Sequence, residues 1–85
     1  MKWGLAITNP AERGLRKLSR EEQEHLNRVF DLMRNNPFHG DIKFLRGGRG
    51  TIRRRIGDIR IFYDLHQDIK VIVITAVERR SSKTY

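Results

Sequence analysis

The sequence contains 85 residues, with 18 Lys or Arg against 10 Asp or Glu, which gives a formal net charge of +8. This length corresponds to one small domain, residues 1–85. No apolar run approaches the ~20 residues of a membrane span, and the N-terminus lacks the apolar stretch of a signal peptide. Without cysteine, a disulfide framework and a thiolate metal site are excluded. We therefore expect a small, soluble, cytoplasmic protein with an anionic partner.

The first 18 residues predict a strand and a short helix. Alternating apolar residues predict a strand at residues 3–7. Asn9 is then expected to be a helix N-cap, with Pro10 at the first helical position. The apolar residues that follow repeat at helical spacing as far as Leu18.

A second helix is predicted to begin at Ser19, because Glu22 stands three residues later in the spacing of a capping box. Asn35-Asn36-Pro37 is predicted to end this helix. The turn between the two helices is very short, so they should form a helical hairpin. The second helix has an apolar face at helical spacing, which consists of Leu26, Val29, Phe30 and Met33.

After Gly40 the pattern changes to strands. Gly57-Asp58 has the length and the leading glycine of a type II′ hairpin turn. The last strand is almost unbroken in apolar character, as expected of a central strand. The predicted strands are Ile42–Leu45, Thr51–Ile56, Ile59–Leu65 and Val71–Val77.

The order β-α-α-β-β-β-β predicts an α+β fold. Two N-terminal helices should pack on one face of a small, mainly antiparallel sheet of four to five strands. Trp3 and Phe44 are expected to pack in this fold rather than to stack on bases.

Most of the basic surplus lies in residues 42–60, which hold seven basic residues against Asp58 alone. Such a dense run of one sign favours an anionic partner. Outside the catalytic set described below, the residues expected to bind nucleic acid are Lys43, Arg46, Arg49, Arg54 and Arg79.

The Gly57-Asp58 turn fixes a register in which Arg55 faces Arg60 across the hairpin. Arg53 lies on the same face as this pair, opposite the isoleucine-rich core face. Two opposed arginines repel each other, and a bound phosphate would turn that repulsion into a clamp.

Two alternatives remain open for this hairpin. Asp64 or another carboxylate would neutralise the arginine pair, or the pair would simply point into solvent. Arg54 falls on the isoleucine face in the predicted register, so it would reach solvent at the sheet margin, or the register would be shifted by one residue.

The sequence contains little conventional hydrolytic chemistry. Its three histidines, His25, His39 and His66, lack metal-ligand spacing, so no metal and no other cofactor is expected. RNA cleavage needs less apparatus, because RNA carries its own nucleophile, the 2′-hydroxyl. Clustered guanidinium groups can stabilise charge on the phosphorane.

The chain resembles the RelE/ParE superfamily of bacterial toxins from type II toxin–antitoxin systems, on the RelE-like side. The resemblance covers nearly the whole length. It is carried by residues 10–18, the Asn36-Pro37 stop, residues 40–47, the run from Arg53 to Tyr63, Val77-Glu78-Arg79-Arg80 and the terminal Tyr85.

The resemblance implies a ribosome-dependent endoribonuclease that cuts mRNA in the decoding site and inhibits translation. Arg60 matches the functional arginine after the Gly-Asp turn, and Arg53 and Arg55 match basic positions on the preceding strand. Arg80 matches the arginine after the last strand, with Arg79 as the alternative, and Tyr85 matches the terminal tyrosine. The implied catalytic set is Arg53, Arg55, Arg60, Arg80 and Tyr85.

The resemblance also implies a cognate antitoxin that forms a hetero-oligomer with the chain, besides mRNA and the small ribosomal subunit as partners. Thr51 stands where well-known ribonuclease members carry a lysine, so the residue that removes the 2′-hydroxyl proton is left open. A ParE-like poison of DNA gyrase and a non-catalytic module that binds nucleic acid or the ribosome are the alternatives.

Overall fold

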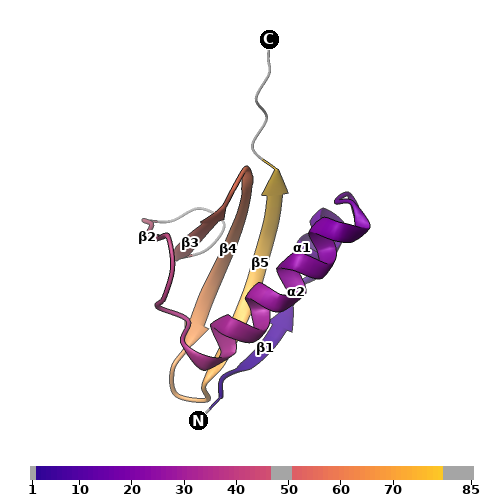
Figure 1. The fold of residues 1–85 in the computed structure, drawn as a ribbon. Helices are drawn as coiled ribbons and strands as arrows, with labels where there is room; N and C mark the ends of the chain where they lie inside the picture. The colour runs from indigo at the N-terminus through magenta and orange to yellow at the C-terminus, as the bar shows by residue number, and fades with distance from the viewer. Residues whose placement is uncertain (1, 47–50, 80–85) are drawn as a thin grey trace.

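The computed structural model describes residues 2–46 and 51–79. They form two helices and a five-stranded sheet (Figure 1). The elements in chain order are β1 (Gly4–Ile7), α1 (Asn9–Arg16), α2 (Arg20–Asn35), β2 (Ile42–Phe44), β3 (Ile52–Ile56), β4 (Ile59–His66) and β5 (Val71–Arg79).

The sheet has the order β1-β5-β4-β3-β2. β1 runs parallel to β5, and every other neighbouring pair is antiparallel. The expected α+β fold and element order are thus confirmed, and the apolar last strand is central, between β1 and β4. In the described residues, no helix is long and apolar enough to cross a membrane.

The two helices begin with different capping arrangements. Ser19 caps α2, and a complete capping box with Glu22 forms as predicted. α1 is capped by Thr8, not by Asn9. The Thr8 hydroxyl also donates to the carbonyls of Ile74 and Thr75, at 3.0 and 3.2 Å. Thr8 therefore fixes the start of α1 against β5, a tertiary role that local sequence preference does not reveal.

The core lies between the helices and one face of the sheet. Apolar residues of both helices pack on Ile61, Tyr63, Ile72 and Ile74, each with no exposed surface. In Figure 1 the helices lie over the β1 and β5 side of the sheet, away from β2. Trp3 is buried as expected, but Phe44 on β2 is 64% exposed, so the prediction that it packs is wrong.

The β3–β4 hairpin has the predicted register, with Arg55 opposite Arg60 and Ile56 opposite Ile59. Gly57 opens the turn with φ of 59°, a left-handed conformation that glycine adopts without strain. Because side chains alternate across a strand, this register assigns each arginine of β3 and β4 to one face of the sheet.

Candidate nucleic-acid interface

Two cross-strand rows of side chains form the sheet face opposite the helices, which we call the arginine face. In one row, Arg55 and Arg60 are direct neighbours, Glu78 follows Arg60 on β5, and Asp41 flanks Arg55. The second row runs from Lys43 on β2 through Arg53 to Phe62. The structure thus brings Lys43, Arg53, Arg55 and Arg60 together, with one carboxylate at each end of the arginine pair.

Asp41 lies beside Arg55. The Nε atom of Arg55 donates to the Asp41 carboxylate at 3.2 Å, and its backbone N–H donates to the Asp41 carbonyl at 2.9 Å. Asp64, the carboxylate named as a neutralising partner from the sequence, instead accepts two hydrogen bonds of 2.7 Å from Thr51. A carboxylate therefore does meet this arginine pair, but it comes from the segment before β2.

The Nε atoms of Arg53 and Arg60 are buried and have no hydrogen-bond partner in the part of the chain that the structure describes. A buried polar group without a partner costs about 1–3 kcal/mol, and more when it is charged. Two such donors on one face, beside a third arginine, are complementary to an anion with several acceptor oxygens, such as a phosphodiester.

Arg54 lies on the other face of the sheet, among core residues, with 9% of its surface exposed. Its Nη1 donates to the His39 carbonyl at 3.0 Å, and its guanidinium packs under Gly40, where φ is 103°. The structure thus supports the predicted register and leaves Arg54 apart from the arginine face, in a structural role. Its expected contact with nucleic acid stays a prediction.

The segment before β2 is held by a second buried side chain. The Tyr63 hydroxyl donates to the Pro37 carbonyl at 2.7 Å. Burial raises the pKa of Tyr63 to about 12, so its phenol remains a donor at physiological pH. Together with Arg54, this hydrogen bond fixes the backbone that places Asp41 next to Arg55.

Arg79 is directed to the helix side of the sheet end, because it pairs with Ile59 in the β4–β5 register. It forms an ion pair with Glu22 at the start of α2 and donates to Asp58 in the hairpin turn at 2.9 Å. The hydrogen bond from Arg79 lowers the pKa of Glu22, and the same pairing raises the pKa of Arg79. These contacts tie three elements together and separate Arg79 from the arginine face.

The remaining predicted residues lie at the sheet margin or outside the described residues. Lys43 is exposed on β2, and Arg46 is exposed just after it. Arg49, Arg80 and Tyr85 lie outside the described residues. Within residues 2–46 and 51–79, no group of three or more His, Asp or Glu side chains is arranged to hold a metal ion.

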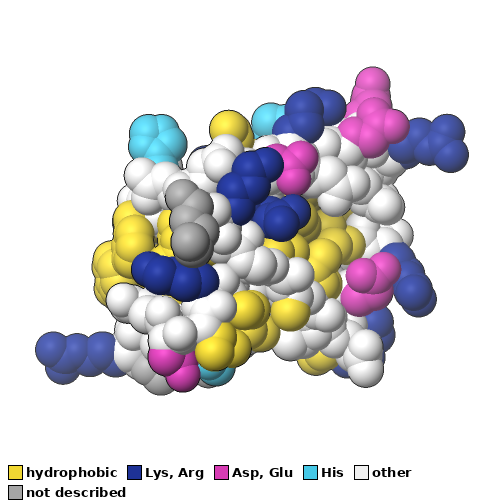
Figure 2. Space-filling view, turned by 90° about the horizontal axis from the view of Figure 1, so that it is seen from below, with side chains coloured by type: hydrophobic (Ala, Val, Ile, Leu, Met, Phe, Trp, Pro, Cys, Tyr) yellow, Lys and Arg dark blue, Asp and Glu magenta, His cyan; other side chains and the backbone are white. Residues whose placement is uncertain are grey.

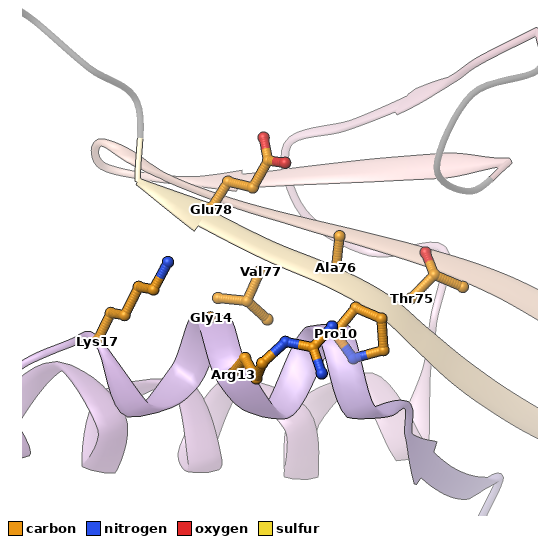
Figure 3. Close-up of a pocket in the computed structure, with 8 residues that line it drawn as sticks. All are labelled: Pro10, Arg13, Gly14, Lys17, Thr75, Ala76, Val77 and Glu78. Carbon is orange, nitrogen blue, oxygen red and sulfur yellow. The ribbon is translucent and has the colours of Figure 1, made fainter.

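A groove of about 480 Å³ runs between α1 and the end of β5 (Figure 3). Arg13 and Lys17 line it from α1, and Glu78 lines it from β5. α1 approaches β5 closely here: a Cβ atom added to Gly14 would stand only 2.1 Å from the Val77 carbonyl oxygen. The groove therefore adjoins the arginine face at Glu78.

Hydrophobic side chains reach the surface at the end of the molecule seen in Figure 2, among scattered basic ones. The segment after α2 exposes 46% of Phe38, and the β4–β5 turn exposes 65% of Ile69. The Phe38 ring meets Trp3 edge-on, with 6.5 Å between centroids. Neither Phe38 nor Ile69 adds a charged group to the arginine face.

Two carboxylates at the site, Asp41 and Glu78, were not singled out from the sequence. The spacing of the predicted strands carried a signal for Asp41, since a residue just before a strand paired to β3 must face Arg55 or its neighbour. No comparable signal exists for Glu78, whose position depends on an irregularity in the β4–β5 pairing.

Comparison with known proteins identifies the family to which this chain belongs. Residues 5–83 match the family model of the ParE toxin of the type II toxin–antitoxin system parDE. The chain belongs to the ParE toxin family. A search of curated proteins finds no match.

Solved toxin structures share the fold. The toxin–antitoxin complex RelBE2 from Mycobacterium tuberculosis matches with a TM-score of 0.82 and 26% identity, covering 94% of this chain and 100% of that chain. The archaeal RelE–RelB complex from Pyrococcus horikoshii OT3 matches at 0.81 and 23%, covering 98% and 100%. The isolated E. coli RelE toxin matches at 0.78 and 18%, covering 95% and 87%. The resemblance to the RelE/ParE superfamily is thereby confirmed, and the chain is a type II toxin of that superfamily.

Proposed function

We propose that this toxin is an endoribonuclease that cleaves mRNA on the ribosome and so inhibits translation. Attack of the 2′-hydroxyl on the adjacent phosphodiester would leave a cyclic phosphate. The observation that carries the proposal is the pair of buried Nε atoms on Arg53 and Arg60, which lack partners among the described residues. A scissile phosphate supplies the acceptors that these donors need.

The arginines divide into three roles in this proposal. Arg55 and Arg60 face each other and stabilise the charge that develops on the phosphorane. Arg53, one row away, orients the RNA backbone. For Arg80 we propose assistance to the leaving group, and for Tyr85 proton transfer or stacking on a base.

The partners follow from the same surface. Lys43 and Arg46 extend the positive charge along the sheet margin toward RNA. We further propose that a cognate antitoxin neutralises the toxin by laying acidic side chains across the arginine face in a hetero-oligomer. Two of the similar structures are complexes of a toxin with its antitoxin. The cytoplasm, where mRNA and ribosomes meet, is the proposed site of action.

A second candidate function is poisoning of DNA gyrase, favoured by the match to the ParE family model. The third is binding to nucleic acid or to the ribosome without catalysis. These functions differ in which polymer is broken when the toxin is expressed without its antitoxin, so one experiment separates them.

The test expresses the wild type, Arg60→Ala and the matched control Arg28→Ala in growing bacteria and maps mRNA 5′ ends and DNA breaks. Arg28 is exposed on α2, away from the sheet. We expect ribosome-phased mRNA cuts with the wild type and Arg28→Ala that disappear with Arg60→Ala. DNA breaks with intact mRNA would establish the gyrase target. Growth arrest with both polymers intact would instead support binding to nucleic acid or to the ribosome without catalysis.

A further inference from the structure

The β4–β5 pairing contains one irregularity, and it determines which residue faces Arg60. From the turn between β4 and β5, the pairing is regular from His66 opposite Val71 as far as Tyr63 opposite Ile74. It then shifts by one residue, so that Phe62 faces Ala76 and Arg60 faces Glu78. Without the shift, Arg60 would face Val77. Such β-bulges re-aim side chains and are over-represented beside active sites.

The bulge places a half-buried carboxylate on the arginine face. Directly opposed residues in an antiparallel pair have Cβ atoms about 4.5–5.5 Å apart, so the Glu78 carboxylate lies within reach of the Arg60 guanidinium and of a phosphate bound to it. Figure 3 shows Glu78 directed away from α1, whereas Val77 is directed toward the helix. Glu78 therefore belongs to the same surface as the proposed phosphate clamp.

The other carboxylates near the sheet occupy different positions. Asp58 and Glu22 contact Arg79 on the helix side. Asp64 is bonded to Thr51, and Asp41 lies beyond Arg55, on the far side of the arginine pair from β5. Among the described carboxylates, Glu78 is thus the one placed next to Arg60.

A cation neighbours this carboxylate on the same face of the sheet, since Arg60 lies directly opposite Glu78 on β4. Arg13 and Lys17 line the adjoining groove from α1, on the side from which Glu78 is directed away. A carboxylate beside a bound phosphodiester is within reach of the neighbouring 2′-hydroxyl and can act as its proton acceptor. The arrangement combines a proton acceptor and an anion clamp on one face.

We propose that Glu78 is the general base for RNA cleavage, a role that rests on the proposed ribonuclease function. The Glu78 carboxylate takes the proton of the 2′-hydroxyl, and the 2′-oxygen forms a bond to the neighbouring phosphorus. Arg55 and Arg60 stabilise the negative charge on the phosphorane. The bond from phosphorus to the 5′-oxygen then breaks, and that oxygen takes a proton from water. Glu78 returns its proton to water, which leaves a 2′,3′-cyclic phosphate and a 5′-hydroxyl.

The test measures cleavage of mRNA on programmed ribosomes by the wild type, by Glu78→Gln and by the matched control Glu24→Gln, which replaces an exposed carboxylate on α2. Loss of a general base lowers rates by roughly 10²- to 10⁴-fold. We expect Glu78→Gln to lower kcat by at least 10²-fold with KM changed less than threefold. Glu24→Gln should cleave like the wild type.

A second variant separates a base from a structural residue. Glu78→Ala removes the carboxylate and leaves space for a small anion. Added formate should therefore raise the cleavage rate of Glu78→Ala at least tenfold, while chloride at equal concentration should not. Cleavage by Glu78→Gln within threefold of the wild type, or an absence of formate rescue, would overturn the assignment. If the wild type cleaves no RNA, the proposed function fails first, and the two failures are therefore distinguishable.

Discussion

Asp41 holds Arg55 through the Nε atom, at 3.2 Å from the carboxylate Oδ2. A carboxylate bound on the Nε side leaves the outer edge of the guanidinium for another anion, as in bidentate recognition of phosphate. The position of Asp41 is itself fixed from the core side of the sheet, because the backbone carbonyls shortly before it accept hydrogen bonds from Arg54 and Tyr63. Buried side chains of the core thus determine how Arg55 is held on the opposite face of the sheet.

Replacement of Asp41 by Ala should therefore lower cleavage without unfolding the protein. The pair is about half exposed on both sides, and exposed pairs contribute only about 0–1 kcal/mol to stability. We expect the cleavage rate to fall about tenfold, a fraction of the roughly 10²- to 10³-fold cost of losing a donor entirely. Faster cleavage by Asp41→Ala would instead show that Asp41 competes with the phosphate for Arg55.

Adjacent residues Arg53 and Arg54 should respond to substitution in opposite ways, because they lie on opposite faces of β3. Arg54→Met removes a buried donor from the His39 carbonyl, so denaturant melts should show a loss of roughly 1–3 kcal/mol. Its RNA binding should keep the salt dependence of the wild type.

Arg53→Met should not destabilise the protein, because it removes a buried donor that has no partner among the described residues. It should reduce the slope of log K against log salt by about 0.7, as expected for one lost contact to a single-stranded phosphate. The same slope for Arg53→Met as for the wild type, together with a reduced slope for Arg54→Met, would contradict the assignment of the two faces.

Gly14→Ala should separate α1 from β5. The added Cβ would stand 2.1 Å from the Val77 carbonyl oxygen, whereas a Cβ on Gly4 would be 3.5 Å from its nearest neighbour, an ordinary contact. We expect Gly14→Ala to lower the free energy of unfolding by roughly 1–3 kcal/mol. Gly4→Ala serves as the matched control in the same thermal melts, and equal stability of the two variants would be inconsistent with this packing.

The Glu22–Arg79 pair predicts a specific acid sensitivity. The pKa of Glu22 is lower in the folded protein than its ordinary value of 4.5, so the pair stabilises the fold above that value. This contribution is lost as the pH falls from 4.5 through the lowered pKa. Glu22→Gln should be less stable than the wild type at pH 7, and the difference should shrink toward pH 3. A difference that stays constant with pH would refute the ion-pair account.

The hairpin register could be predicted because its causes are local. A two-residue turn at Gly57-Asp58 determines which residues pair, and alternation then divides the arginines between the two faces. The capping box at Ser19 is local for the same reason. These short-range features place Arg53, Arg55 and Arg60 together before any tertiary contact is known.

The rest of the site depends on contacts between distant segments. Thr8, rather than Asn9, caps α1 because its hydroxyl also meets β5. Phe44 is exposed because the helices lie over β1 and β5 and leave β2, at the other edge of the sheet, uncovered. Glu78 lies opposite Arg60 only because of a one-residue shift in the pairing of β4 and β5. No local sequence pattern predicts that shift.

The central claim is that the opposed arginines bind a scissile phosphate. The most direct measurement is the rate of mRNA cleavage on programmed ribosomes by purified wild type, Arg60→Ala and the control Arg28→Ala, with the cyclic phosphate end as the readout. We predict that Arg60→Ala lowers the rate by about 10²- to 10³-fold while Arg28→Ala does not change it. Cleavage by Arg60→Ala at the wild-type rate would contradict the account.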